Sequence, residues 1–162
     1  MSGAGKSTAL AALARQGFEV VETDVSPWSE WSRAAGGYVW REDLVRDLLE
    51  RERHTPLYVA GAVSNQGTFY SRFDAIVLLS APQDVLLRRI ESRTTNDYGK
   101  RRQQRDRIIR DIVEVEPLLR ATCTHEIDTT KPLADVVTEL IAIGEGATFR
   151  RGSHRRARAR CP

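Results

Sequence analysis

The first residues of the chain combine glycines, a lysine and hydroxyl side chains at a spacing that suits phosphate binding. They read Met1-Ser2-Gly3-Ala4-Gly5-Lys6-Ser7-Thr8. Glycines let backbone N–H groups turn toward one anion, Lys6 offers a cation to β- and γ-phosphates, and Ser7 offers a hydroxyl to Mg²⁺. A helix predicted directly after this loop would point the positive end of its dipole at the same anion. The alternative interpretation is a flexible Gly/Ser segment that contains a lysine by chance.

The loop is incomplete when it is compared with the full pattern G-x-x-x-x-G-K-S/T. With Gly5 as the second glycine, the first glycine would fall one residue before Met1. The strand that should precede the loop is absent as well. We therefore expect Met1 to be an internal methionine of a longer natural protein. A relative that has lost its first strand is the alternative.

Apolar runs and helical periodicity alternate along the rest of the chain. Buried strands are predicted at about 18–22, 57–60, 73–80 and 125–128, and helices at about 8–16, 40–53, 82–93, 100–121 and 133–143. Residues 25–39 are predicted to form a loop with a short helix, and the long helix is expected to kink near Pro117. This alternation predicts an α/β fold with a parallel sheet and helices on both faces.

Composition narrows the function classes. The 162 residues are 41% hydrophobic and 29% charged, which is typical of one soluble globular domain, and no apolar run is long enough to cross a bilayer. Two cysteines, Cys123 and Cys161, are too few for a disulfide framework, so a reducing cytoplasm is the expected compartment.

The net charge of +3 comes from the end of the chain. Residues 150–162 contain six arginines and no acid, so the remainder carries a formal charge of −3. We expect a nucleotide-binding domain over residues 1–143 and a basic, disordered tail over residues 144–162. Because the basic charge is confined to one arm rather than a folded face, nucleic acid is not the expected partner.

With its phosphate loop and order of elements, the sequence resembles the P-loop small-molecule kinases: nucleoside-monophosphate kinases, shikimate kinase and gluconate kinase. It is still more similar to bacterial AAA-type ATP-binding proteins whose loop reads Gly-Met-Ser-Gly-x-Gly-Lys-Ser-Thr and which also have an Asn-Gln-Gly loop, here Asn65-Gln66-Gly67. The resemblance implies a sheet of strand order 2-3-1-4-5, from which this chain lacks the central first strand. It also implies ATP and Mg²⁺ as cofactors.

The resemblance implies that residues at or after the ends of the first two predicted strands bind the phosphoryl acceptor; we call this region the acceptor side. It places Glu22 near Mg²⁺, and Asp24 at the acceptor hydroxyl as a possible base. Arg41 would bind an anionic group of the acceptor, and Gly61 would let the acceptor approach the backbone. The polar loop Ser64-Asn65-Gln66 could hydrogen-bond the acceptor. The alternatives are a helix cap for Asp24, a solvated helix charge for Arg41, and ordinary turn chemistry for the loop.

Two arginines lie one helical turn apart after the strand at 73–80. By resemblance, Arg89 would lie against adenine and Arg93 would balance charge on the transferring phosphoryl group. A solvated basic helix face is the alternative.

The predicted site residues form four sets. The nucleotide-binding set is Gly3, Ala4, Gly5, Lys6, Ser7, Thr8 and Arg89, and the catalytic set is Lys6, Asp24 and Arg93. The acceptor set is Asp24, Arg41 and Gly61, and the metal set is Ser7 and Glu22.

The sequence therefore predicts a kinase that moves the γ-phosphoryl group of ATP to a small-molecule acceptor. A nucleotide-binding regulatory protein without turnover is the second hypothesis, because position 22 is Glu rather than Asp and the strand Leu57–Ala60 is not followed by an acid. Nucleic-acid binding through residues 150–160 is a third and weaker one.

Overall fold

The computed structural model describes residues 1–158, with side chains described through residue 147. The chain divides into two compact units. Unit 1 consists of residues 1–9 and 76–136, and unit 2 consists of residues 10–75 and the segment that begins at residue 137.

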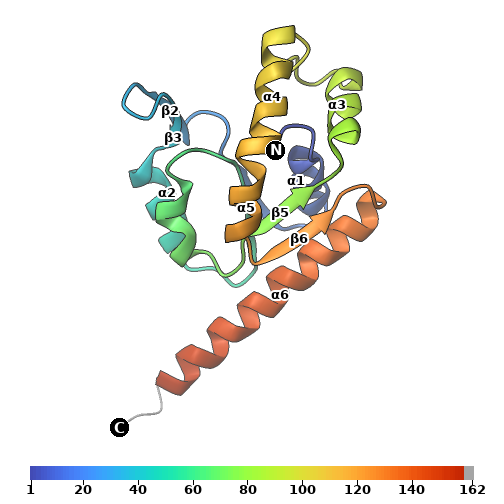
Figure 1. The fold of residues 1–162 in the computed structure, drawn as a ribbon. Coiled ribbons are helices and arrows are strands. Elements are labelled where there is room, and N and C mark those ends of the chain that lie inside the picture. The colour runs from blue at the N-terminus through green and yellow to red at the C-terminus, as the bar shows by residue number, and fades with distance from the viewer. Residues whose placement is uncertain (159–162) are drawn as a thin grey trace. The chain divides into compact units, whose positions relative to one another are not determined.

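Unit 1 contains the phosphate-loop sequence, one parallel strand pair and three helices (Figure 1). Strand β5 (Val77–Ser80) pairs with β6 (His125–Asp128). The helices are α3 (Gln83–Ser92), α4 (Arg102–Glu114) and α5 (Glu116–Thr122). Pro117 lies in the first turn of α5, where its missing N–H is tolerated. The break predicted near Pro117 therefore separates α4 from α5.

Unit 2 contains a second parallel pair, an antiparallel hairpin and the longest helix. Strand β1 (Glu19–Glu22) pairs with β4 (Leu57–Ala60), and β2 (Ser29–Ser32) pairs with β3 (Gly37–Trp40). The helical elements are α2 (Glu42–Glu50), the 3-10 helix η1 (Gln66–Arg72), and α6 (Leu133–Arg158), which starts in unit 1. Helix α1 (Lys6–Arg15) also begins in unit 1 and ends in unit 2.

The mixture of helices and small parallel sheets agrees with the predicted α/β class. The pairs β1-β4 and β5-β6 are the two that the order 2-3-1-4-5 requires on either side of its first strand. The complete order stays a prediction.

The hairpin β2–β3 replaces the loop and short helix predicted for residues 25–39. Trp31, Tyr38 and Val39 are residue types that favour strands, and Gly36 adopts a φ of +62° in the connecting turn. Trp40 was predicted to begin a helix but ends β3, and the helix begins at Glu42. Trp40 matches the apolar spacing of the helix that follows because its side chain is buried, although the residue itself belongs to a strand.

The core of unit 2 beneath the hairpin is aromatic. Trp40, Val45 and Phe69 are buried together, and partly buried Trp28, Leu49, Val63 and Phe73 pack against them. The rings of Trp40 and Phe69 meet edge to face at 5.7 Å. Trp40 is therefore a fixed anchor for the end of β3.

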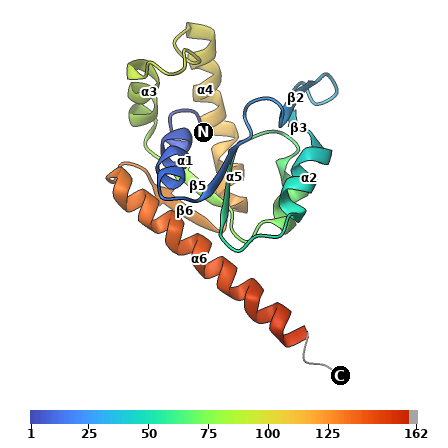
Figure 2. The same ribbon diagram turned by 180° about the vertical axis from the view of Figure 1, so that it is seen from behind.

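Helix α6 extends past residue 143, where the sequence predicted its end, as both views show (Figure 2). It contacts β4 through Tyr58, whose hydroxyl donates a hydrogen bond to the Leu140 carbonyl at 3.3 Å. A Cβ added at Gly144 would lie 2.5 Å from the same hydroxyl. Burial raises the pKa of Tyr58, and Glu145 raises it further. The existence of a separate tail over 144–162 stays a prediction, and residues 159–162 lie outside the described part of the chain.

Candidate functional site

The phosphate loop is built from backbone turns around one buried side chain. Gly3 and Gly5 have φ values of +79° and +88°, and Ala4 between them is fully buried. Only glycine adopts this left-handed backbone at little cost. The Gly5 carbonyl accepts the first helical bond of α1, from the Ala9 N–H at 2.9 Å. The loop therefore ends at the amino end of a helix, and the N–H groups of a first helical turn favour anions.

Three side chains at the start of α1 carry the polar groups expected of a phosphate site. The Lys6 ammonium donates to the Met1 carbonyl at 3.3 Å, so the side chain folds back along its own loop. Ser7 and Thr8 are exposed in the first turn. All three lie in unit 1, as do Gly3, Ala4 and Gly5. This donor set suits a triphosphate with its metal ion: N–H groups and an ammonium for phosphate oxygens, and a hydroxyl for Mg²⁺.

Helix α3 lies directly against the phosphate loop. A Cβ added at Gly3 would be 2.7 Å from the Leu86 carbonyl oxygen and 3.2 Å from Ile90. Leu86 and Ile90 are fully buried. The backbone of Gly3 therefore approaches α3 more closely than any larger residue would allow.

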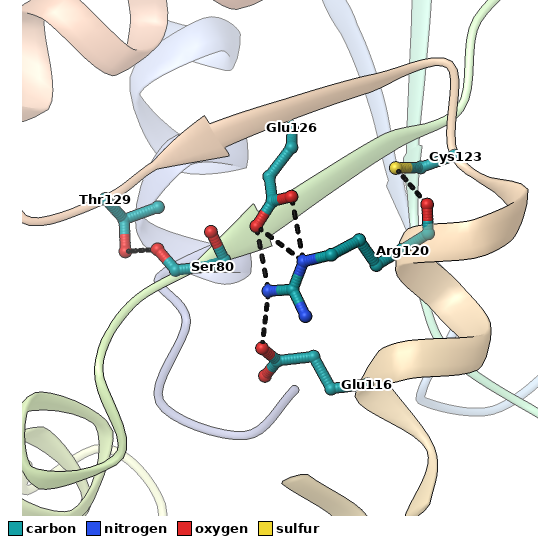
Figure 3. Close-up of polar contacts among 6 residues, drawn as sticks. All are labelled: Ser80, Glu116, Arg120, Cys123, Glu126 and Thr129. Carbon is teal, nitrogen blue, oxygen red and sulfur yellow. Dashed lines mark hydrogen bonds and ion pairs between the residues drawn. The ribbon is translucent and has the colours of Figure 1, made fainter. Parts of the chain in front are cut away.

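Arg89, on the same helix, is held by the segment that follows β6. Its guanidinium donates to the Thr129 hydroxyl at 2.9 Å and to the Thr129 carbonyl at 2.6 Å. Thr129 is buried, and its hydroxyl donates to the Ser80 carbonyl (Figure 3). Its N–H donates to the same carbonyl. Thr129 thus joins α3, β5 and the end of β6 around Arg89. The sequence did not reveal these contacts of Thr129, because its partners are 40 and 49 residues away.

Arg93 shapes the segment that follows α3. It follows α3, and its guanidinium donates to the carbonyl of Asn96 at 3.1 Å and to that of Tyr98. Its predicted role toward a phosphoryl group stays a prediction. In the structure it closes the turn over residues 96–98.

A cluster of acidic and basic side chains between α5 and β6 was not foreseen from the sequence. Arg120 bridges Glu116, at 2.8 Å, and Glu126, to which it donates from two nitrogens at 2.9 Å (Figure 3). Hydrogen bonds from Arg120 and then Ser80 lower the pKa of Glu126, and the two carboxylates raise that of Arg120. Glu116 and Arg120 lie four apart on α5, and this spacing was the available signal. The cluster fastens α5 to β6.

In unit 2, Asp24 and Gly61 lie together at the carboxyl ends of β1 and β4. The Ala62 N–H donates to the Asp24 carboxylate at 3.0 Å. A Cβ added at Gly61 would lie 3.1 Å from that carboxylate and 2.1 Å from the Thr23 hydroxyl. Thr23 is fully buried, and both its N–H and hydroxyl donate to the Ala60 carbonyl. Asp24 itself is exposed, so its carboxylate sits at a strand end, where ligands of parallel sheets bind.

The two remaining predicted residues of unit 2 lie on different elements. Glu22 is the half-buried last residue of β1, paired with Ala60. Arg41 precedes α2 and forms an exposed ion pair with Asp43 at 3.1 Å, the contact expected of a solvated helix charge. The metal role of Glu22 and the acceptor role of Arg41 stay predictions.

The loop Ser64-Asn65-Gln66 performs a structural task. The Asn65 amide accepts from the Trp40 N–H at 2.8 Å and donates to the Trp40 carbonyl at 3.1 Å. Gln66 accepts from the Val63 N–H and donates to the Tyr70 hydroxyl. These bonds fix the end of β3 beside the segment that follows β4. The bond from the Val63 N–H to Gln66 is local turn chemistry, whereas the bonds of Asn65 reach a residue 25 positions away.

Two features that the described residues lack bear on the class of function. No group of three or more His, Cys, Asp or Glu side chains is arranged to hold a metal ion by itself. Mg²⁺ in phosphate-transferring sites commonly uses one or two protein groups together with phosphates and water, so such a group is not required. Among these same residues, no helix has the length and apolar character of a membrane span.

A sequence profile described as an AAA domain matches residues 1–110. The matched region contains the phosphate loop, the hairpin, β5 and α3. No curated protein matches the chain, and neither does any solved structure.

Proposed function

The chain belongs to the family of AAA domains, nucleotide-binding P-loop proteins that include kinase-like members, and from this premise we propose that it transfers the γ-phosphoryl group of ATP to a small-molecule acceptor. The observation that carries the proposal is the loop of Gly3, Ala4 and Gly5. Its two left-handed glycines enclose a buried alanine and lead into a helix that starts with Lys6.

On this proposal, Lys6 and the loop N–H groups bind the β- and γ-phosphates, and Ser7 is a metal ligand, with Glu22 close to the metal's water shell. Mg²⁺ would supply charge neutralisation of the phosphates. The buried Thr129 holds the Arg89 guanidinium in place, which supports a role for Arg89 beside the base of the nucleotide. Phosphoryl transfer depends mostly on such positioning and charge.

Asp24 is the residue proposed to orient the acceptor hydroxyl. One carboxylate oxygen already accepts the Ala62 N–H, which fixes the rotamer of the side chain. A carboxylate held in this way can accept the hydroxyl proton. Gly61 leaves the Asp24 carboxylate uncovered because any side chain at this position would press against it.

The test measures binding of Mg-ATP by calorimetry and transfer by phosphorus NMR over a panel of hydroxyl acceptors. Lys6→Ala is expected to weaken ATP binding about 10–100-fold, the usual cost of losing a hydrogen bond to a charged group. Arg15→Ala removes a cation from the opposite end of the same helix and is the matched control. Unchanged ATP binding by Lys6→Ala would exclude the phosphate-loop function.

A nucleotide-binding regulator without turnover is the second candidate. The observation that favours it is the contact of Asp24 with the Ala62 N–H, because this carboxylate already serves as the cap of a turn. The two candidates differ in the effect of Asp24→Asn. A kinase would lose transfer and keep ATP binding, whereas a regulator would bind ATP tightly and transfer phosphate to no acceptor with either residue.

A further inference from the structure

The outer edge of strand β2 presents main-chain groups that point away from the hairpin. In an antiparallel ladder, opposite residues alternate between pairs that exchange hydrogen bonds and pairs that do not. The Arg41 N–H donates to the Trp28 carbonyl at 2.8 Å, and this bond fixes the alternation along the hairpin. Ser29 and Trp31 therefore belong to pairs that exchange no bonds. Their N–H and C=O groups face outward, on the side of β2 opposite to β3.

The two edges of the hairpin differ in how such outward groups are used. On β3, the Tyr38 carbonyl accepts bonds from the N–H and the hydroxyl of Ser64. The Trp40 N–H and carbonyl bond with the Asn65 amide. Within the part of the chain that the structure describes, the outward groups of β2 have no hydrogen-bond partner, and β2 pairs with β3 alone. An edge of this kind is a template for a further strand.

Strand β2 has none of the features that usually block pairing at an edge. Its sequence, Ser29–Ser32, contains no lysine, no proline and a single charged residue, Glu30. Trp31 on β2 and Tyr38 on β3 are 56% and 59% exposed. The turn of the hairpin projects from unit 2 in both ribbon views (Figures 1 and 2). A strand from another molecule therefore has access to this edge.

The order of residues along β2 allows this edge to pair with itself. A two-fold axis at Trp31 places this residue opposite Trp31 of a second copy, and Glu30 opposite Ser32 of that copy. The two Trp31 residues then exchange two main-chain hydrogen bonds across the axis. The Ser32 hydroxyl accepts from the Ala35 N–H at 3.2 Å, and its own proton can be donated to the Glu30 carboxylate of the second copy.

The neighbouring register is less favourable. An axis at Glu30 would also align outward-facing groups, but it would place two Glu30 carboxylates directly opposite each other. Like charges at opposite positions of a sheet are destabilising. An unrelated peptide would have to supply a hydroxyl opposite Glu30 and an apolar residue opposite Trp31. β2 itself supplies both at adjacent positions and in the antiparallel order, so the second copy is the occupant that this edge fits.

We propose that two copies of the chain pair antiparallel along β2, about a two-fold axis at Trp31, and form a sheet in the order β3-β2-β2-β3. The two Trp31 rings then lie side by side at the axis, with Tyr38 on the outer side of each. One short strand per copy makes a smaller interface than that of a stable complex, so the dimer is weak and reversible. The pairing uses no residue of the proposed nucleotide or acceptor sites and does not rest on the proposed function.

The experiment measures sedimentation velocity of the full chain from about 10 μM to about 1 mM, where weak association becomes visible. The matched variants are Trp31→Ala, which removes the ring and keeps the N–H, and Trp31→Pro, which removes both. Proline is tolerated on an edge strand where the N–H faces outward, and urea denaturation checks that both variants fold.

Trp31→Ala should raise the dissociation constant of the dimer about threefold, as expected for the loss of a cross-strand aromatic pair. Trp31→Pro should raise it at least about tenfold further, because the two hydrogen bonds at the axis are lost. Leu118→Ala, which removes an exposed apolar side chain from α5, should leave it unchanged and is the control. Glu30→Gln should weaken the dimer slightly, because a charged acceptor is lost.

A cross-linking measurement tests the register independently of the proline variant. Opposite residues of a hydrogen-bonded pair have Cα atoms about 5.5 Å apart, a distance that a disulfide can bridge. In a background with Cys123→Ser and Cys161→Ser, mild oxidation of Trp31→Cys should give a cross-linked dimer. Tyr38→Cys, whose counterpart lies three strand spacings or about 14 Å away, should give none.

Four results would overturn the proposal. The chain could stay monomeric at every concentration, which would leave the edge to water or to another peptide. Trp31→Ala and Trp31→Pro could dimerise equally well, which would exclude main-chain pairing at residue 31. Tyr38→Cys could cross-link as readily as Trp31→Cys. A stronger dimer for Glu30→Gln would mean that the two carboxylates oppose each other, and the axis at Trp31 would be wrong.

Discussion

The phosphate loop of unit 1 and the proposed acceptor side of unit 2 are shaped by different parts of the chain. In the loop, the main chain is decisive: Gly3 and Gly5 turn it, and no side chain larger than hydrogen fits at Gly3 beside Leu86. On the acceptor side, side chains bind main-chain groups far along the sequence, as Asp24 does at Ala62 and Asn65 at Trp40. A site made by the main chain leaves a short local motif, whereas a site made by distant side chains leaves none.

The largest effect is expected from Gly3→Ala, which tests the main-chain half of this comparison. The new Cβ would meet the Leu86 carbonyl at 2.7 Å and would occupy a backbone with φ of +79°. Left-handed backbone and overpacking together should cost about 3 kcal/mol of unfolding free energy. Urea denaturation measures this cost, and ATP binding should weaken with it. Gly146→Ala meets nothing within 4 Å and is the control.

Gly61→Ala is the corresponding change on the acceptor side. Its Cβ would come within 2.1 Å of the Thr23 hydroxyl, which is buried and bonded to Ala60. The expected loss is about 2 kcal/mol in urea denaturation. Gly67→Ala has open space around it and should be neutral. If Gly61→Ala and Gly67→Ala were equally stable, the segment after β4 would adjust easily to the added Cβ. The contrast between the phosphate loop and the acceptor side would then be weaker.

Thr129→Val tests whether the stability of unit 1 also depends on a contact between distant side chains. The substitution keeps the shape but removes the hydroxyl between Arg89 and Ser80. The expected loss is about 1 kcal/mol. Thr55→Val, at an exposed position, is the control. The same stability for Thr129→Val as for the wild type would mean that the remaining bond from Arg89 to the Thr129 carbonyl holds the guanidinium alone.

The smallest effect is expected from Glu126→Gln, which tests how this carboxylate contributes to stability in acid. Arg120 lowers the pKa of this carboxyl in the folded protein, so its stabilisation is complete above the ordinary pKa of about 4.3 and is lost as the pH falls through the lowered value. Glu126→Gln should remove about 0.5 kcal/mol near neutral pH and flatten the decline in stability below about pH 4. Thermal unfolding from pH 7 to pH 3 measures this, with Glu30→Gln as control. A decline as steep as that of the wild type would assign acid sensitivity to other carboxylates.

Local patterns predicted much of this molecule. The helix after the loop, the strands near 18–22, 57–60 and 125–128, and the break near Pro117 each depend on neighbouring residues and agree with the structure. The strand expected at 73–80 is shorter, because only Val77–Ser80 pairs with β6. The hairpin was not predicted, because its stability depends on burial of Trp40 among residues up to 33 positions away, such as Phe73.

The site residues also divide into those that neighbouring residues predict and those that depend on distant contacts. The phosphate loop could be recognised from consecutive residues, and its geometry agrees with that interpretation. The fixing of Arg89 by Thr129 and of Trp40 by Asn65 could not be recognised, because each pair is separated by 25 residues or more. The roles of Asp24, Arg41 and Arg93 toward a substrate stay predictions.

The contact between Gly144 and Tyr58 has a mechanical consequence. A helix that passes an aromatic ring only where it lacks a side chain cannot slide along its own axis, because the next residue to reach the ring would collide with it. A movement of α6 at Gly144 would therefore displace Tyr58, three residues before Gly61.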